Sequence, residues 1–150
     1  MTTLPRTILV AIDFSDHADH ALDYAAGLAQ RLDAKLHLVH AIAVPSLGVP
    51  ELGVAYSSMM MESTVKEAQD ALAALAARYR DRSPIATTHL EVGDARDVID
   101  RVAETIGADL IVMGTHGRRG IRRALLGSVA EAIVRSAPCP VLVVRPSKHS

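Results

Sequence analysis

The chain has 150 residues, of which 49% are hydrophobic and 22% charged, with a formal net charge of −1. This length and composition predict one folded domain over residues 1–150 and exclude a disordered chain, and no apolar run reaches the roughly 18–20 residues of a membrane span. The near-zero net charge argues against a protein that attracts nucleic acid or acidic membranes through its overall field.

Apolar strands and helical patterns alternate along the first half of the chain. The expected elements are a strand over 7–13, a helix from Ser15 or Asp16 to about Leu32, a strand over 35–41, an irregular loop or lid over 42–57 and a helix over about 58–80. The first strand is a β-rich apolar run, which is typical of burial on both faces. Two prolines and two glycines in 42–57 disfavour regular structure there.

The alternation continues in the second half. The expected elements are a strand over 85–92, a helix over 94–106 with Gly107 as its stop, a strand over 109–114, a loop rich in glycine and arginine, a helix opened by Gly127 and Ser128 and ended by Pro138, and a strand over 140–145. Polar and apolar residues alternate in the strand over 85–92, which predicts an edge strand with one wet face.

Five strands that alternate with four helices predict an α/β fold, a doubly wound five-stranded parallel sheet with helices on both faces. The expected strand order is 3-2-1-4-5, with the two most apolar strands in the middle. Ligands of such sheets bind at the carboxyl ends of the strands where the order reverses, between strands 1 and 4. Asp13 and Gly114 both fall at that place.

The loop after the fourth strand has the features of an anion site. Gly114 and Gly117 permit positive φ and let backbone N–H groups approach a ligand closely. Gly127 and Ser128 lie at a helix N-terminus, where free N–H groups and the helix dipole favour an anion. The alternative is an ordinary glycine-rich surface turn.

Arginines add positive charge to this loop. Between Asp109 and Glu131 the chain has four arginines, Arg118 and Arg119 among them, and no acidic residue. Such a local excess of guanidinium groups suits a polyphosphate, although solvated surface arginines would give the same pattern.

Acidic and histidine side chains offer further candidates. Asp13 can accept hydrogen bonds from ribose hydroxyls, cap the following turn, or do both. His17 and His20 share a helix face, but no third ligand completes a metal site with them. His37 and His40 fall on opposite faces of one strand and cannot chelate together, whereas His116 lies inside the expected phosphate loop.

The spacing G-x2-G-x9-G-[ST] from Gly114 to Ser128 resembles the signature of the ATP-binding branch of the universal stress protein family. Segments 8–15 (ILVAIDFS), 107–114 (GADLIVMG) and 137–144 (APCPVLVV) are similar to that family as well. The resemblance covers essentially the whole chain, and the chain departs from it only in the loop over 42–57.

The resemblance implies a nucleotide-binding role for each matching position. Asp13 would face the ribose or adenosine, and the edge of the adenine would contact Val39, His40 and Ala41. The ribose and α-phosphate would be wrapped by Met113, Gly114 and Gly117. The outer phosphates would be held by Gly127, Ser128 and Val129. ATP would be the ligand, with Mg²⁺ or Mn²⁺ bound through its phosphates and no protein ligand for the metal identified.

We therefore expect an ATP-binding regulatory or sensing homodimer of the stress response. The strand over 141–145 lies at a sheet edge without a polar residue in its apolar run, so it predicts pairing with a second copy, and the family resemblance implies the same dimer. A single cysteine and the absence of a signal-peptide layout predict a cytoplasmic protein.

Three other functions stay open. A slow ATPase or autokinase would use the same site, with only Asp13 and His116 available as nucleophile or base. A scaffold dimer would carry a vestigial site, and a nucleic-acid module would use the arginines. The sequence has no G-x4-G-K-[ST], so it does not predict a P-loop hydrolase.

Overall fold

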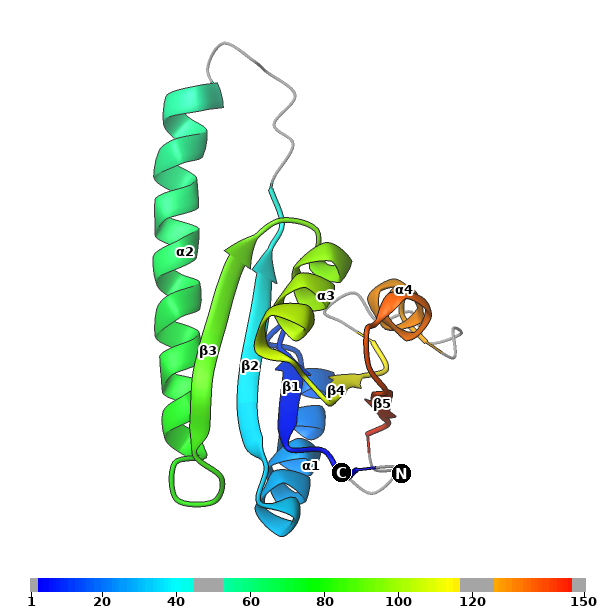
Figure 1. Ribbon diagram of the computed structural model, residues 1–150. Helices are drawn as coiled ribbons and strands as arrows, with labels where there is room; N and C mark the ends of the chain where they lie inside the picture. The colour runs from blue at the N-terminus through cyan, green and yellow to red at the C-terminus, as the bar shows by residue number, and fades with distance from the viewer. Residues whose placement is uncertain (1–2, 45–52, 117–125, 147–150) are drawn as a thin grey trace.

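The structure, a computed structural model, describes residues 3–44, 53–116 and 126–146 and contains five strands alternating with four helices (Figure 1). In chain order these are β1 (Thr7–Ala11), α1 (Asp16–Leu32), β2 (Lys35–Ile42), α2 (Gly53–Arg78), β3 (Ile85–Val92), α3 (Ala95–Ile106), β4 (Leu110–Gly114), α4 (Ser128–Ser136) and β5 (Val141–Val144). Within the described part of the chain, no helix is both long and apolar enough to cross a membrane.

The strands form one parallel sheet in the order β3-β2-β1-β4-β5, which confirms the predicted topology. Helices α1 and α2 pack on one face over Ile8, Val10 and Leu38, and α3 and α4 pack on the other face over Leu9 and Ile111. The two central strands are therefore buried on both sides, as their uninterrupted apolar sequences predict.

Side chains cap two of the helices at their N-termini. The Ser15 hydroxyl accepts a hydrogen bond from the Ala18 amide at the start of α1, and the Asp94 carboxylate accepts one from the Asp97 amide at the start of α3. These bonds satisfy amides that the first turn of a helix leaves without an intrahelical partner. At its C-terminus α3 ends in the left-handed Gly107, as the sequence predicts.

The start of α2 and the end of β1 differ from the sequence prediction by more than one residue. Helix α2 begins at Gly53, inside the segment expected to be irregular over 42–57. No proline follows Pro50 until the helix has ended, and glycine is tolerated at a helix start, so nothing interrupts helix formation from Gly53 onward. Strand β1 ends at Ala11, and Asp13 accordingly lies in the turn after the strand and not within it.

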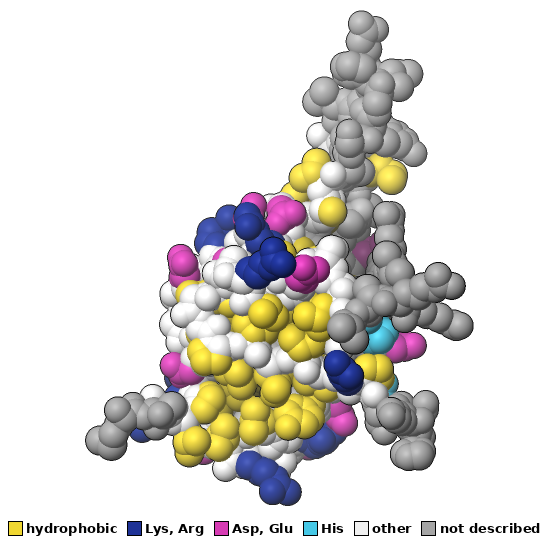
Figure 2. All heavy atoms as spheres, turned by 90° about the vertical axis from the view of Figure 1, so that its right-hand side faces the viewer, with side chains coloured by type: hydrophobic (Ala, Val, Ile, Leu, Met, Phe, Trp, Pro, Cys, Tyr) yellow, Lys and Arg dark blue, Asp and Glu magenta, His cyan; other side chains and the backbone are white. Residues whose placement is uncertain are grey.

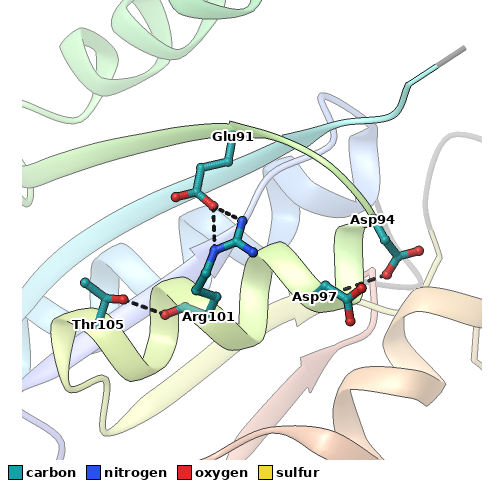
Figure 3. Close-up of polar contacts among 5 residues, drawn as sticks. All are labelled: Glu91, Asp94, Asp97, Arg101 and Thr105. Carbon is teal, nitrogen blue, oxygen red and sulfur yellow. Dashed lines mark hydrogen bonds and ion pairs between the residues drawn. The ribbon is translucent and has the colours of Figure 1, made fainter.

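The edge strand β3 has the predicted wet face. Residues 86–88 are exposed, and in Figure 1 the lower parts of β2 and β3 have no described helix in front of them. Two histidines meet on this uncovered face, where His37 Nδ1 of β2 lies 3.3 Å from His89 Nε2 of β3. Next to them Arg101 of α3 forms an ion pair with Glu91 of β3 (Figure 3).

This histidine pair makes the stability of the fold depend on pH. Burial lowers the pKa of His37, and the charges of His89 and Lys35 lower it further; burial also lowers the pKa of His89, against the opposing effect of Glu91. A pKa below the unfolded value of about 6.5 means that folding favours the neutral imidazoles. The stability that the two neutral imidazoles contribute to the fold is thus complete above about pH 6.5. It is lost as the pH falls through their lowered pKa values in the folded protein.

We expect the melting temperature of the native protein to fall more steeply between pH 7.5 and pH 5 than that of a His37→Gln, His89→Gln double variant. Thermal unfolding followed by circular dichroism across this range measures the difference, because all other titrating groups are shared. Parallel profiles for the two proteins would show that the pair does not titrate as described.

Candidate functional site

The central strands end at different levels at the carboxyl edge of the sheet. The last pair between β1 and β4 is Val10 with Val112, whereas β4 continues to Gly114. On the other side β1 ends opposite Val39, and β2 continues past it to Ile42. Because β1 ends before both of its neighbours at this edge of the sheet, backbone groups of β2 and β4 on the sides that face β1 lie beyond its last residue.

Asp13 organises the turn from β1 to α1. Its Oδ1 accepts hydrogen bonds from the Ser15 amide at 3.0 Å and from the Ser15 hydroxyl. The turn-capping role that the sequence left open is therefore present in the structure. Both bonds use the same oxygen, and the side chain is only partly buried beyond the carboxyl end of β1.

The residue after Asp13 has an unusual backbone. Phe14 has a φ of 62°, in the left-handed region that few residues other than glycine adopt. Its ring lies against His40, with ring centroids 4.7 Å apart, and His40 Nδ1 lies 2.6 Å from the carbonyl oxygen of Ile12. Because a carbonyl oxygen can only accept a hydrogen bond, Nδ1 of His40 carries a proton and donates the hydrogen bond to Ile12. These contacts hold the turn, and the sequence gives no sign of them.

Helix α4 presents a different N-terminus from α1 and α3. Its N-cap is Gly127, which supplies no side-chain hydrogen bond to the first turn. The Gly127 carbonyl accepts from the Glu131 amide, so the amides of residues 128–130 are those that an α-helix leaves without an intrahelical partner. Ser128 is exposed and Val129 is 39% exposed, which makes this helix end accessible to a ligand.

Gly114 is needed for packing rather than for an unusual φ. Among the described glycines a left-handed φ occurs only at Gly93 and Gly107, so the predicted use of positive φ at Gly114 is wrong. A Cβ at Gly114 would lie 2.8 Å from the carbonyl oxygen and the Cβ of His17, in the first turn of α1. The close approach that glycine permits here is that of a helix to a strand.

Gly127 also contacts the chain itself. Its amide donates to the Thr115 carbonyl at 2.6 Å, and an added Cβ would lie 3.2 Å from that oxygen and 3.3 Å from the Cα of His116. A bulky substitution at Gly127 would therefore disturb the contact between β4 and α4 as well as the approach of a ligand.

Two histidines that are far apart in the sequence lie side by side next to the carboxyl end of β4. The rings of His17 and His116 are 5.5 Å apart between centroids, and His17 Nδ1 lies 3.4 Å from the buried Thr115 hydroxyl. His17 lies in the first turn of α1 and His116 follows β4, so only the packing of α1 against β4 brings them together. No periodicity in the sequence could have revealed this contact.

The remaining candidates divide into three groups. Val39 and Met113 have buried side chains in the core between the sheet and helices α3 and α4, so they offer only backbone groups to a ligand. His40 and Ala41 are partly buried near the carboxyl end of β2. Gly117, Arg118 and Arg119 lie outside the described residues.

Among the described residues, no three His, Cys, Asp or Glu side chains are grouped to hold a metal ion.

Comparison with known proteins gives one consistent family. A family model described as the universal stress protein family matches residues 5–145. A protein of Staphylococcus aureus (strain USA300), named as a universal stress protein, is 38% identical over 146 residues, which span 93% of this chain and 84% of the relative.

Solved structures agree with this result. Universal stress protein UspA from Lactobacillus plantarum has a TM-score of 0.83 at 30% identity, with 93% of this chain and 97% of that chain covered. A universal stress protein in complex with cAMP has a TM-score of 0.64 at 26% identity, with 97% of this chain and 100% of that chain covered.

Proposed function

The chain belongs to the universal stress protein family, and on that premise we propose that it binds ATP as a regulatory ligand in the stress response. The observation that carries the proposal is the exposed N-terminus of α4, which has no side-chain cap and lies beside the carboxyl end of β4, where the Gly127 amide bonds to the Thr115 carbonyl. The relative solved with cAMP supports an adenine nucleotide as the class of ligand.

The outer phosphates would bind at the first turn of α4. Backbone amides at a helix N-terminus and the positive end of the helix dipole attract an anion. Ser128 adds a hydroxyl donor, and Gly127 keeps the approach free of a side chain. Glu131 is the acidic residue of this first turn, and its carboxylate forms an ion pair with Arg135, which reduces its repulsion of a phosphate.

A polyphosphate fits this end of the protein better than a single phosphate does. The four arginines in the sequence between Asp109 and Glu131, including Arg118 and Arg119, would add positive charge after Gly117. When Mg²⁺ or Mn²⁺ is bound with ATP, it offsets charge between the phosphates. We assign it no protein ligand.

The adenosine would lie between β2 and the turn after β1. Ile12 donates to the Val39 carbonyl, and in a parallel ladder the backbone groups of alternate residues point to the same side. Ala41 therefore directs its N–H and C=O toward the space beyond β1, where they can bind the adenine edge. Asp13 would accept a ribose hydroxyl through Oδ2, since its capping bonds use Oδ1.

Variants at Asp13 test the ribose contact. Asp13→Ala should weaken ATP binding by about 1.5–3 kcal/mol, as for the loss of a hydrogen bond to a charged group, and should also lower the melting temperature because the cap at Ser15 is lost. Asp13→Asn keeps an oxygen for the Ser15 amide, so it should retain more of the stability than Asp13→Ala and still bind ATP more weakly. Calorimetric titration with ATP measures the affinity, and wild-type affinity in both variants would exclude the contact.

We further infer that the protein acts as a cytoplasmic homodimer joined through β5. In the described sheet β5 pairs on one side only, with β4, and all four of its residues are partly exposed. Figure 2 shows hydrophobic side chains gathered on this side of the molecule, and Val134 of α4 is 50% exposed. An apolar edge strand of this kind is normally covered, and the same strand of a second copy about a two-fold axis would cover it.

The register identifies the residue to change. Ile111 donates to the Pro140 carbonyl and pairs with Val141, so Leu142 and Val144 direct their amides toward β4 while Val141 and Val143 direct theirs outward. Val143→Pro should therefore remove an edge hydrogen bond and yield a folded monomer of 16.0 kDa in sedimentation experiments. Leu142→Pro, the matched control, should instead damage the fold. A wild-type monomer at micromolar concentration would contradict the proposed dimer.

A further inference from the structure

The histidine pair on the uncovered face of β2 and β3 places two imidazole nitrogens at a separation that one metal ion can bridge. His37 lies near the amino end of β2, whereas the nucleotide site proposed above lies at the carboxyl ends of the strands. His37 pairs with Thr87 and His89 pairs with Val39, so the two histidines are diagonal neighbours on one face of the sheet. Their rings are nearly parallel, with centroids 5.5 Å apart and an angle of 24° between the planes.

The nitrogen separation fits a shared metal ion. Zinc binds imidazole nitrogen at about 2.0–2.1 Å, and two ligands at a tetrahedral angle are then roughly 3.3–3.4 Å apart. His37 Nδ1 and His89 Nε2 are 3.3 Å apart. Imidazole is a preferred ligand of Zn²⁺, Cu²⁺ and Ni²⁺. Both side chains are only partly buried, so an ion from solvent can reach them. The backbone hydrogen bonds between the paired strands β2 and β3 hold the two ligands in place.

We propose that His37 and His89 form a two-histidine binding site for a divalent transition-metal ion of the imidazole-preferring class, with water in the remaining coordination positions. Without metal the two facing nitrogens share one proton in a hydrogen bond. When the metal ion binds, the ring that donated this hydrogen bond carries its proton on its other nitrogen. The two facing nitrogens then each offer a lone pair to the ion, and the neutral pair releases no net proton.

The surroundings of the pair favour this ligand form. Burial lowers the pKa of both histidines, which keeps them neutral near pH 7, and metal ligation requires the neutral form. Glu91 contributes a negative charge on the same strand, two residues from His89, and its ion pair with Arg101 holds it against α3 (Figure 3). Lys35, two residues before His37, is the opposing positive charge.

Calorimetric titration with ZnCl₂ tests the site in protein that carries no histidine tag and no nucleotide. We expect saturable binding of one ion per chain, and His37→Gln and His89→Gln should each weaken it by more than about tenfold, because even the loss of an outer-shell partner of a metal ligand costs that much. His20→Gln on α1 and His17→Gln next to the carboxyl end of β4 are the matched controls, and both should bind zinc as the wild type does. Melting temperatures in the absence of metal show whether each variant is folded.

Nitrogen NMR of the wild-type histidine rings keeps the test independent of the variants. Addition of zinc should shift His37 Nδ1 and His89 Nε2 and leave the ring nitrogens of His17, His20 and His40 in place. The absence of saturable binding, wild-type zinc affinity in either ligand variant, or zinc-induced shifts at other histidines would each overturn the proposal. ATP binding is measured separately, so failure of this site leaves the proposed nucleotide function untouched.

Discussion

Gly114→Ala should destabilise the protein markedly, although it adds a single methyl group. The new Cβ would lie 2.8–2.9 Å from the carbonyl oxygen, carbonyl carbon and Cβ of His17. Two of these atoms belong to the backbone of the first turn of α1, so no side-chain rotation relieves the contact. Overpacking of this kind costs about 1–3 kcal/mol or more. At this chain length each kcal/mol lowers the melting temperature by about 2–4 °C.

Gly27→Ala is the matched control for this experiment. Gly27 lies inside α1, and an added Cβ there would meet nothing within 4 Å. Because alanine is the better helix former by about 0.8–1 kcal/mol, the melting temperature of this variant should rise. Thermal unfolding of both variants beside the wild type measures the two effects. A Gly114→Ala protein as stable as the wild type would mean that α1 does not lie against β4 as described.

Ser128→Pro should weaken ATP binding strongly and leave the fold intact. Residue 128 is the first of α4, a position where proline is favoured because its missing amide has no intrahelical partner. The preceding Gly127 has a ψ of 166°, which is the extended conformation that a residue before proline prefers. The substitution removes one amide and one hydroxyl from the proposed phosphate site. Loss of a single bond to a charged group weakens affinity by roughly 10- to 100-fold.

Ser128→Ala separates the two donors. It removes the hydroxyl and keeps the amide, so its ATP affinity should fall between those of the wild type and Ser128→Pro. Calorimetric titrations give the affinities, and circular dichroism shows that α4 persists. If Ser128→Pro bound ATP as tightly as the wild type, the phosphates could not lie at the start of α4.

Much of the fold follows from local sequence. The strand order could be predicted because 7–13 and 109–114 are apolar without interruption, which places them in the middle of the sheet. The caps at Ser15 and Asp94 follow from side chains that accept a hydrogen bond from the amide three residues further on. The local sequence does not predict the start of α2, because prolines and glycines disfavour a helix in the segment before it, although none of them lies inside the helix beyond Gly53.

The site was less predictable because its contacts join distant segments. Nothing local indicates that Phe14 adopts a left-handed backbone, since phenylalanine rarely does. The contact of Gly114 with His17 depends on how α1 packs against β4, so the local sequence indicates only a ligand approach for this glycine. The sequence shows only that His37 and His40 lie on opposite faces of one strand, whereas the register between β2 and β3 brings His89 beside His37.

Native mass spectrometry of the wild-type protein, purified without added nucleotide and then incubated with ATP, tests the proposed function most directly. It reports on a ligand carried over from the cell as well as on one bound in vitro. We predict that each chain gains the mass of one ATP, with or without a divalent ion, and that Ser128→Pro largely loses this adduct under the same conditions. A spectrum of unliganded chains alone, at millimolar ATP, would contradict the proposal that the exposed start of α4 is a nucleotide site.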